Sequence, residues 1–465
     1  MDDHPLAGGL RPWRDGLPLV AAVAMVLVAA AVGACVASPR QEASTPDGAV
    51  ATPPAAAGDG STSRAGSPSE PESREPGSSE SPSGAVEPPP GQDTAGFGQL
   101  SEQVAAIREL PLQRRVRARV VGSQALADKV SELGFAETDR RETEADQRLL
   151  VALRLAPADL DLSGLLEDLY REQVRGVYVP DEKTFYVSGE PDELDSAGRV
   201  TAAHEITHAL QDQSFDLQRL RRAVEDDDDA SLALLALIEG DAVLTGQLWT
   251  ARHLDDSEQA QAQLEAGGGG SALERAPRYL REALFFPYLR GAAFVAQLHA
   301  TGGYEAVDAA FERPPDTTEQ ILHPEAYADD EPALKVAVPG RPGDGWSASQ
   351  TYDFGEFDLV ELFADLGSET AVQVSDGWGG GQVRSWTRDS DTAVGLALAF
   401  DTPADADEAC SALPQWYAEV ADGRSAGEGL LSGDRDVLAY ACDTRGVRMG
   451  LAPNATTARR LAGIP

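Results

Sequence analysis

Basic residues, histidine and cysteine are all scarce in this chain. It has 38 Lys and Arg against 77 Asp and Glu, so that its formal charge is −39 over 465 residues. A surface this acidic argues against nucleic acid or an anionic membrane surface as a partner, because both are bound through clustered basic side chains. The length allows two or three domains.

The only three cysteines are Cys35, Cys410 and Cys442. If Cys35 carries a lipid, the other two are free to pair in an oxidising compartment. The alternative is a pair of buried free thiols. A disulfide between them would close a loop of the C-terminal part of the chain.

The longest hydrophobic run is Leu17–Ala37, which follows Arg11 and Arg14. Its end, Val32–Cys35, resembles a bacterial lipobox, in which the cysteine is lipidated and becomes the mature N-terminus. The other interpretation is an uncleaved transmembrane helix, for which about 20 apolar residues are enough. Both place the rest of the chain outside the cytoplasm. We therefore predict a lipid-anchored protein on the extracytoplasmic face of the cell membrane, with a single-pass anchor as the alternative.

Residues 1–35 are thus expected to be the anchor, and residues 36–95 a disordered linker. The linker is rich in Pro, Ser, Gly and Glu and has no apolar periodicity. Such a segment cannot bury enough surface to offset its ordering entropy. It would tether the folded part of the chain to the membrane.

Two of the six histidines lie four residues apart in the stretch His204–Leu210. Positions i and i+4 of a helix share one face, so both imidazoles can reach one cation. With Glu205 beside the first histidine, this is the H-E-x-x-H pattern of zinc hydrolases. His204 and His208 are expected to bind Zn²⁺, and Glu205 to take a proton from the metal-bound water.

A second helix, expected over residues 231–248, carries Glu239 near an apolar face. A buried carboxylate needs a cation or a hydrogen-bonding partner, and Glu239 is therefore the expected third zinc ligand. Asp241 has two possible roles. It holds the outer nitrogen of a ligand histidine, as carboxylates around metal sites do, or it is itself the ligand in place of Glu239.

The stretch His204–Leu210 followed by a helix with Glu239 resembles the gluzincin metallopeptidases, of which thermolysin is the best-known member. The chain looks more like a less characterised group of bacterial, often membrane-anchored proteins of this kind. They share a Tyr-containing hairpin (Tyr178–Tyr186 here), the run His208–Gln213 and a run ending at Ala242. The resemblance covers about residues 165–330. It implies a zincin fold and proteolysis.

The fold class expected from these patterns is α+β. Residues 96–330 are predicted to form a mostly helical zincin-like catalytic domain with a small β-sheet, which includes a hairpin over residues 176–187. In zincins the edge strand of that sheet holds an extended peptide. The acidic run Glu225–Asp229 is interpreted as a solvated loop. Residues 331–465 are predicted to form a small α+β domain, with strands over 394–400 and 437–442 and a helix over 404–420.

Peptide hydrolysis also needs a donor for the oxyanion, and gluzincins use His or Tyr. His323, Tyr288 and Tyr327 are the candidates. The predicted function is a zinc metalloendopeptidase that hydrolyses a peptide or protein substrate. The alternative is a membrane-tethered binding or scaffold protein with a structural or vestigial zinc site.

Overall fold

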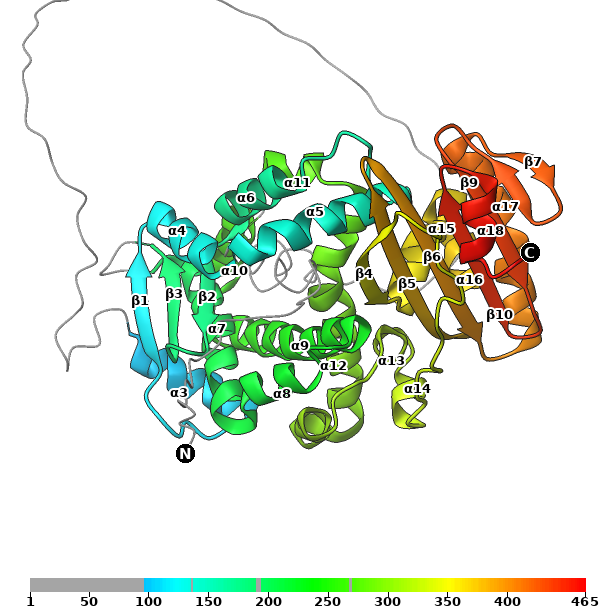
Figure 1. Ribbon diagram of the computed structural model, residues 1–465. Helices are drawn as coiled ribbons and strands as arrows, with labels where there is room; N and C mark the ends of the chain where they lie inside the picture. The colour runs from blue at the N-terminus through cyan, green and yellow to red at the C-terminus, as the bar shows by residue number, and fades with distance from the viewer. Residues whose placement is uncertain (1–95, 135–136, 190–193, 267–269) are drawn as a thin grey trace, which may run out of the picture.

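The computed structural model describes residues 96–134, 137–189, 194–266 and 270–465. The predicted anchor and linker, including Cys35, lie outside these residues. The described chain is a mixed α and β structure with two sheets. Figure 1 shows the small sheet at one side, the large sheet at the other, and a group of helices between them.

The small sheet has three strands in the order β1-β3-β2. Strands β2 (Gly176–Val179) and β3 (Thr184–Ser188) pair antiparallel, which confirms the predicted hairpin. Strand β1 (Arg117–Val121) pairs parallel with β3. Apolar residues at helical spacing predict helices over residues 97–133, and this prediction is wrong for β1. A parallel partner is supplied from a distant part of the chain, so local periodicity does not reveal it.

Two long helices cross the middle of the molecule (Figure 1). Helix α7 (Ser196–Phe215) begins at Asp195, whose side chain accepts a hydrogen bond from the Gly198 N–H. Helix α9 (Asp228–His253) is buried along most of its length. Among the described residues, α9 is the one helix long and apolar enough to cross a membrane, and 83% of its apolar window lies inside the protein, as expected for a core helix.

Helix α12 (Arg278–Glu312) packs along α9 and is kinked at Gly302 and Gly303. The two helices approach very closely at Gly240 and Gly291. A methyl group added at Gly240 would lie 2.3 Å from the backbone of Gly291. This close crossing holds the residues next to Gly240 in place.

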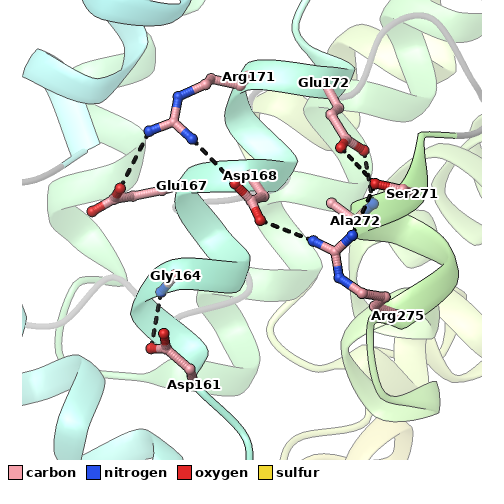
Figure 2. Close-up of polar contacts among 9 residues, drawn as sticks. All are labelled: Asp161, Gly164, Glu167, Asp168, Arg171, Glu172, Ser271, Ala272 and Arg275. Atoms are coloured by element: carbon pink, nitrogen blue, oxygen red, sulfur yellow. Dashed lines mark hydrogen bonds and ion pairs between the residues drawn. The ribbon is translucent and has the colours of Figure 1, made fainter.

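The remaining helices of this part of the chain cover the two central helices and the small sheet. They are α3 (Phe97–Arg108), α4 (Ser123–Gly134), α5 (Glu137–Ala152), α6 (Leu162–Gln173), α8 (Leu217–Ala223), α10 (Asp256–Ala266), α11 (Ser271–Arg275), α13 (Thr318–Leu322) and α14 (Pro324–Ala328). Figure 2 shows how α11 is attached to α6: Arg275 donates to Asp168, and Glu172 accepts hydrogen bonds from Ser271 and the Ala272 N–H. These groups are largely exposed, so each pair contributes only about 0.2–1 kcal/mol.

The large sheet has seven strands in the order β4-β5-β6-β10-β9-β8-β7, and all its pairings are antiparallel. Its strands are β4 (Ser347–Asp353), β5 (Trp378–Arg388), β6 (Asp391–Phe400), β7 (Arg424–Gly427), β8 (Leu430–Ser432), β9 (Val437–Cys442) and β10 (Gly446–Ala452). The accompanying helices are α15 (Glu356–Phe363), η1 (Ala364–Leu366), α16 (Ser368–Ser375), α17 (Pro403–Ala421) and α18 (Ala455–Leu461). The strands and helix expected over residues 394–400, 437–442 and 404–420 are confirmed as β6, β9 and α17.

Cys410 of α17 and Cys442 of β9 form a disulfide, with Cα atoms 6.1 Å apart. The predicted pairing is therefore confirmed. The bridge fastens the helix to the sheet over a sequence separation of 32 residues.

The hydrophobic core is continuous between the central helices and the C-terminal part of the chain. Phe286 of α12 packs on Phe357 of α15, with ring centroids 4.9 Å apart. Arg154 pairs with Asp434 and Asp436, which lie near the far edge of the large sheet. The two predicted domains thus share one core.

The acidic run before α9 corrects one expectation. Asp227 caps the helix by accepting from the Ala230 N–H, and Asp229 is only 5% exposed. Its carboxylate accepts hydrogen bonds from both the N–H and the hydroxyl of Thr318. The interpretation of the whole run as a solvated loop was therefore wrong, because α13 and β4 cover its end.

Candidate metal centre

Helices α7 and α9 bring three side chains together. His204 and His208 lie on successive turns of α7, and Glu239 faces them from α9. The exposed fractions of the three residues are 1%, 8% and 2%. Three donor atoms converge, and they form the one group of this kind that the described residues contain.

The spacing of these donor atoms fits a tetrahedral metal ion. The two Nε2 atoms are 3.0 Å apart, and Glu239 Oε2 lies 3.1 Å from His204 Nε2 and 3.4 Å from His208 Nε2. Zn²⁺ takes such ligands at about 2.0–2.2 Å, which puts ligand atoms of a tetrahedron about 3.3–3.6 Å apart, so the two shorter spacings would widen by a few tenths of an ångström around the ion. The donor set and its spacing therefore suit Zn²⁺, with a fourth position left for water or substrate.

The pKa of each of the three groups depends on at least one of the other two. Burial lowers the pKa of His204 despite its hydrogen bond to the Glu239 carboxylate. Burial opposes the charge of both His208 and Glu239, but their mutual attraction dominates. It raises the pKa of His208 to about 9 and lowers that of Glu239 to about 2. The site therefore stabilises one positive charge next to the Glu239 carboxylate.

Glu205 is also buried, with 1% exposure, and its Oε1 atom accepts no hydrogen bond from the described residues. Burial and the negative charge of Glu239 raise its pKa to about 8, although the charge of His208 and a backbone hydrogen bond from Tyr178 act the other way. A carboxylate with a raised pKa close to neutrality is suited to proton transfer.

Strand β2 lies directly against this glutamate. A Cβ atom added at Gly176 would lie 2.8 Å from Thr201 Cγ2 and 3.1 Å from both Glu205 Cγ and Glu205 Oε1. A side chain at this point would press on both Thr201 and Glu205. The strand order makes β2 an edge strand of the small sheet, so the edge strand and the glutamate are neighbours.

Asp241 takes neither of the two roles considered for it. Its carboxylate accepts from Arg108 Nε at 2.8 Å and from Gln211 Nε2 at 2.8 Å. The outer nitrogen of His208, Nδ1, lies 2.9 Å from Gln211 Oε1 instead. Asp241 therefore reaches the ligand histidine through Gln211, because its side chain points from α9 toward α3.

The three candidate oxyanion donors fall in different places. Tyr288 is fully buried and stacks on His204, with ring centroids 6.3 Å apart. The Tyr327 hydroxyl donates to the Arg313 carbonyl. The structure does not bring Tyr327 into the ligand group.

His323 is also outside the ligand group, and its Nε2 lies 2.9 Å from Glu356 Oε1. It follows α13, which packs at Asp229 on the first turn of α9. Ten residues of helix, or about 15 Å, separate Asp229 from Glu239. Of the candidate donors only Tyr288 adjoins the ligands.

Sequence reasoning missed three residues around the centre. Gln211 is three residues after His208, and this i, i+3 spacing was a usable signal. Arg108 is 96 residues away from His204 in sequence, and nothing local indicated its place. Arg221 of α8 is a third: burial lowers its pKa, while Glu239 and Asp212 act in the opposite direction, and its Nη1 has no partner among the described residues.

Residues 346–462 match a family model described as a domain of unknown function (DUF8575). This segment contains the large sheet and its helices and none of the metal-centre residues. No curated protein and no solved structure matches the chain.

Proposed function

We propose that this protein is a zinc-dependent metalloendopeptidase with a zincin-like catalytic part. The observation that carries the proposal is the position of Glu205. A buried glutamate, one oxygen of which has no partner in the part of the chain that the structure describes, lies beside three donor atoms that could hold one metal ion. A structural metal site requires no such base. The resemblance of the H-E-x-x-H run and Glu239 to the gluzincins supports the same conclusion.

The residues of the proposed site would have different roles. His204, His208 and Glu239 would hold the ion, which when bound supplies Lewis acidity and lowers the pKa of a water molecule to about 7. Glu205 accepts the proton of the attacking water and later donates it to the leaving amine. The same group thus gives back the proton that it takes. Tyr288 is the candidate donor to the oxyanion, since it stacks on His204.

Strand β2 is the proposed binding edge for an extended peptide substrate. An edge strand offers unpaired main-chain groups that can pair with another chain. β2 also contacts Glu205 through Gly176. A peptide paired there would lie next to the catalytic glutamate.

The proposed location rests on the sequence alone. We propose that Cys35 is lipidated and that the catalytic part acts on the extracytoplasmic side of the membrane. The single-pass anchor remains the alternative, and a Cys35→Ala variant that still incorporates a lipid label would contradict lipidation at this residue.

The test measures zinc content and hydrolysis of casein and a peptide library for four proteins. His204→Ala should lose zinc and activity. Glu205→Gln should keep stoichiometric zinc and lose activity, because it removes the base and leaves the ligands. His299→Ala, a histidine of α12 outside the site, is the control and should resemble the wild type.

Stoichiometric zinc in His204→Ala would contradict the ligand assignment. Undiminished hydrolysis by Glu205→Gln would contradict the role of the base. Zinc binding without any hydrolysis by the wild type would favour the alternative, a binding protein with a structural metal site.

A further inference from the structure

A chain of four buried side chains leads from the metal centre to helix α3. Gln211 Oε1 lies 2.9 Å from His208 Nδ1, and Gln211 Nε2 lies 2.8 Å from Asp241 Oδ2. Arg108 Nε then lies 2.8 Å from the same Asp241 oxygen. The side chains of Arg108 and Asp241 are both 0% exposed.

The partners of Gln211 determine which way its amide faces. Its Nε2 is within bonding distance of the Ile238 carbonyl at 3.0 Å and of the Asp241 carboxylate, and both are acceptors. The NH₂ group must therefore face them, so the amide oxygen faces His208. An oxygen acceptor at Nδ1 requires the proton of the His208 ring to be on Nδ1. When the ring is neutral, its lone pair is then on Nε2, the nitrogen that lies next to His204 Nε2 and Glu239 Oε2.

Arg108 holds the far end of this chain. It contacts Asp241, donates from Nη2 to Asp308 at 2.7 Å, and its guanidinium lies 4.5 Å above the ring of Tyr304. These three partners lie on helices α9 and α12, and together they hold the guanidinium in one orientation. An Asp241 carboxylate bound to a fixed cation is in turn a fixed acceptor for Gln211.

We propose that Arg108 is a positioning residue of the metal centre, which acts through Asp241 and Gln211 to set the ring orientation and tautomer of His208. Helix α3 is then part of the metal-binding unit, although it precedes the first ligand by about a hundred residues. The inference rests on the proposed metal site and is independent of whether the site hydrolyses peptides.

The test uses the full-length protein, stripped of metal with a chelator and then titrated with Zn²⁺ and Co²⁺. Removing outer hydrogen-bonding partners of a ligand typically costs 10–100-fold in metal affinity. We expect a loss of that size for Arg108→Gln and for Gln211→Leu, and a smaller loss for Arg108→Lys, which restores the charge without the fork of donors. The visible absorption spectrum of the Co²⁺ protein should change in the two stronger variants.

Arg154→Gln is the matched control. Arg154 is another buried arginine with two aspartate partners, Asp434 and Asp436, remote from the metal centre. It should lower the melting temperature of the metal-free protein and leave Zn²⁺ affinity and the Co²⁺ spectrum unchanged.

Gln211→Leu leaves the Arg108–Asp241 ion pair in place, so it reports on the chain of hydrogen bonds even if Arg108→Gln fails to fold. Wild-type affinity in Gln211→Leu would overturn the inference. So would an Arg108→Lys or Arg108→Gln protein that melts lower but binds Zn²⁺ and Co²⁺ like the wild type. If the wild type itself bound neither ion, the proposed metal site would be wrong.

Discussion

The crossing of α9 and α12 offers a test of how Glu239 is held in place. In Gly240→Ala, the new Cβ would lie 2.3 Å from both C and O of Gly291 and 2.8 Å from the Ala292 N. Those are backbone atoms, which cannot rotate away. Carbon atoms in contact need about 3.4 Å or more, so the two helices must separate by about 1 Å.

The expected cost has two parts. Overpacking of a core contact destabilises by about 1–3 kcal/mol, and a backbone contact belongs at the upper end. Glu239 is the adjacent residue, and a shift of about 1 Å exceeds the roughly 0.2 Å tolerance of metal–ligand distances. Gly240→Ala should therefore lower both the melting temperature and the Zn²⁺ affinity.

Gly246→Ala on the same helix is the control, because a Cβ there meets nothing within 4 Å. Replacing Gly by Ala inside a helix is favourable by about 1 kcal/mol in both variants, so their difference isolates the crossing. Calorimetry with and without Zn²⁺ and a competitive metal titration measure the two effects. Equal melting temperatures and equal affinities in the two variants would refute the argument that this crossing positions Glu239.

Three further predictions concern Gly176, the disulfide and Asp228. In Gly176→Ala the new Cβ would lie 3.1 Å from Glu205 Cγ and Oε1, so Glu205 must shift by a few tenths of an ångström. A misplacement of about 1 Å can cost about 10²-fold in rate, so hydrolysis should fall by less than that while zinc stays bound. Gly122→Ala, where a Cβ meets nothing within 4 Å, should hydrolyse like the wild type. Reducing the bridge between Cys410 and Cys442 should destabilise the C-terminal part by about 3–4 kcal/mol. Thiol titration of the unfolded protein without reductant tests the bridge, and reaction of both cysteines would contradict it. Burial raises the pKa of Asp228 to about 8. The protonated Asp228 carboxyl favours the folded state. This contribution to the free energy of unfolding is fully present below about pH 4 and is lost as the pH rises through 8. The metal-free protein should therefore become less stable between pH 5 and 8, and Asp228→Asn should reduce that slope in denaturant titrations.

Local patterns were sufficient for several elements of this protein. The spacing of His204 and His208 follows from the helical repeat alone, and the hairpin over residues 176–187 follows from two β-rich runs around a Pro-Asp turn. The pairing of Cys410 with Cys442 was predicted by assigning Cys35 to the anchor, which leaves two cysteines and one possible pairing. Each of these predictions depends on residues close in sequence or on the number of cysteines.

Other features exist only because distant segments meet. Strand β1 forms because β3 offers it a parallel partner, and Asp229 is buried because α13 covers it. The role of Asp241 depended on where its side chain pointed, which is set by the packing of α3 against α7 and α9. His323 had suitable chemistry but is bonded to Glu356 instead.

The amino-acid sequence by itself therefore determined the donor types, their helical spacing and the base beside them, since these are properties of one helix. Only the tertiary structure decided how closely Glu239 approaches the two histidines, that Gly176 packs against Glu205, and how Arg108 is connected to His208. The physical reason is that hydrogen bonding and burial act over a few ångströms in space, whatever the separation along the chain.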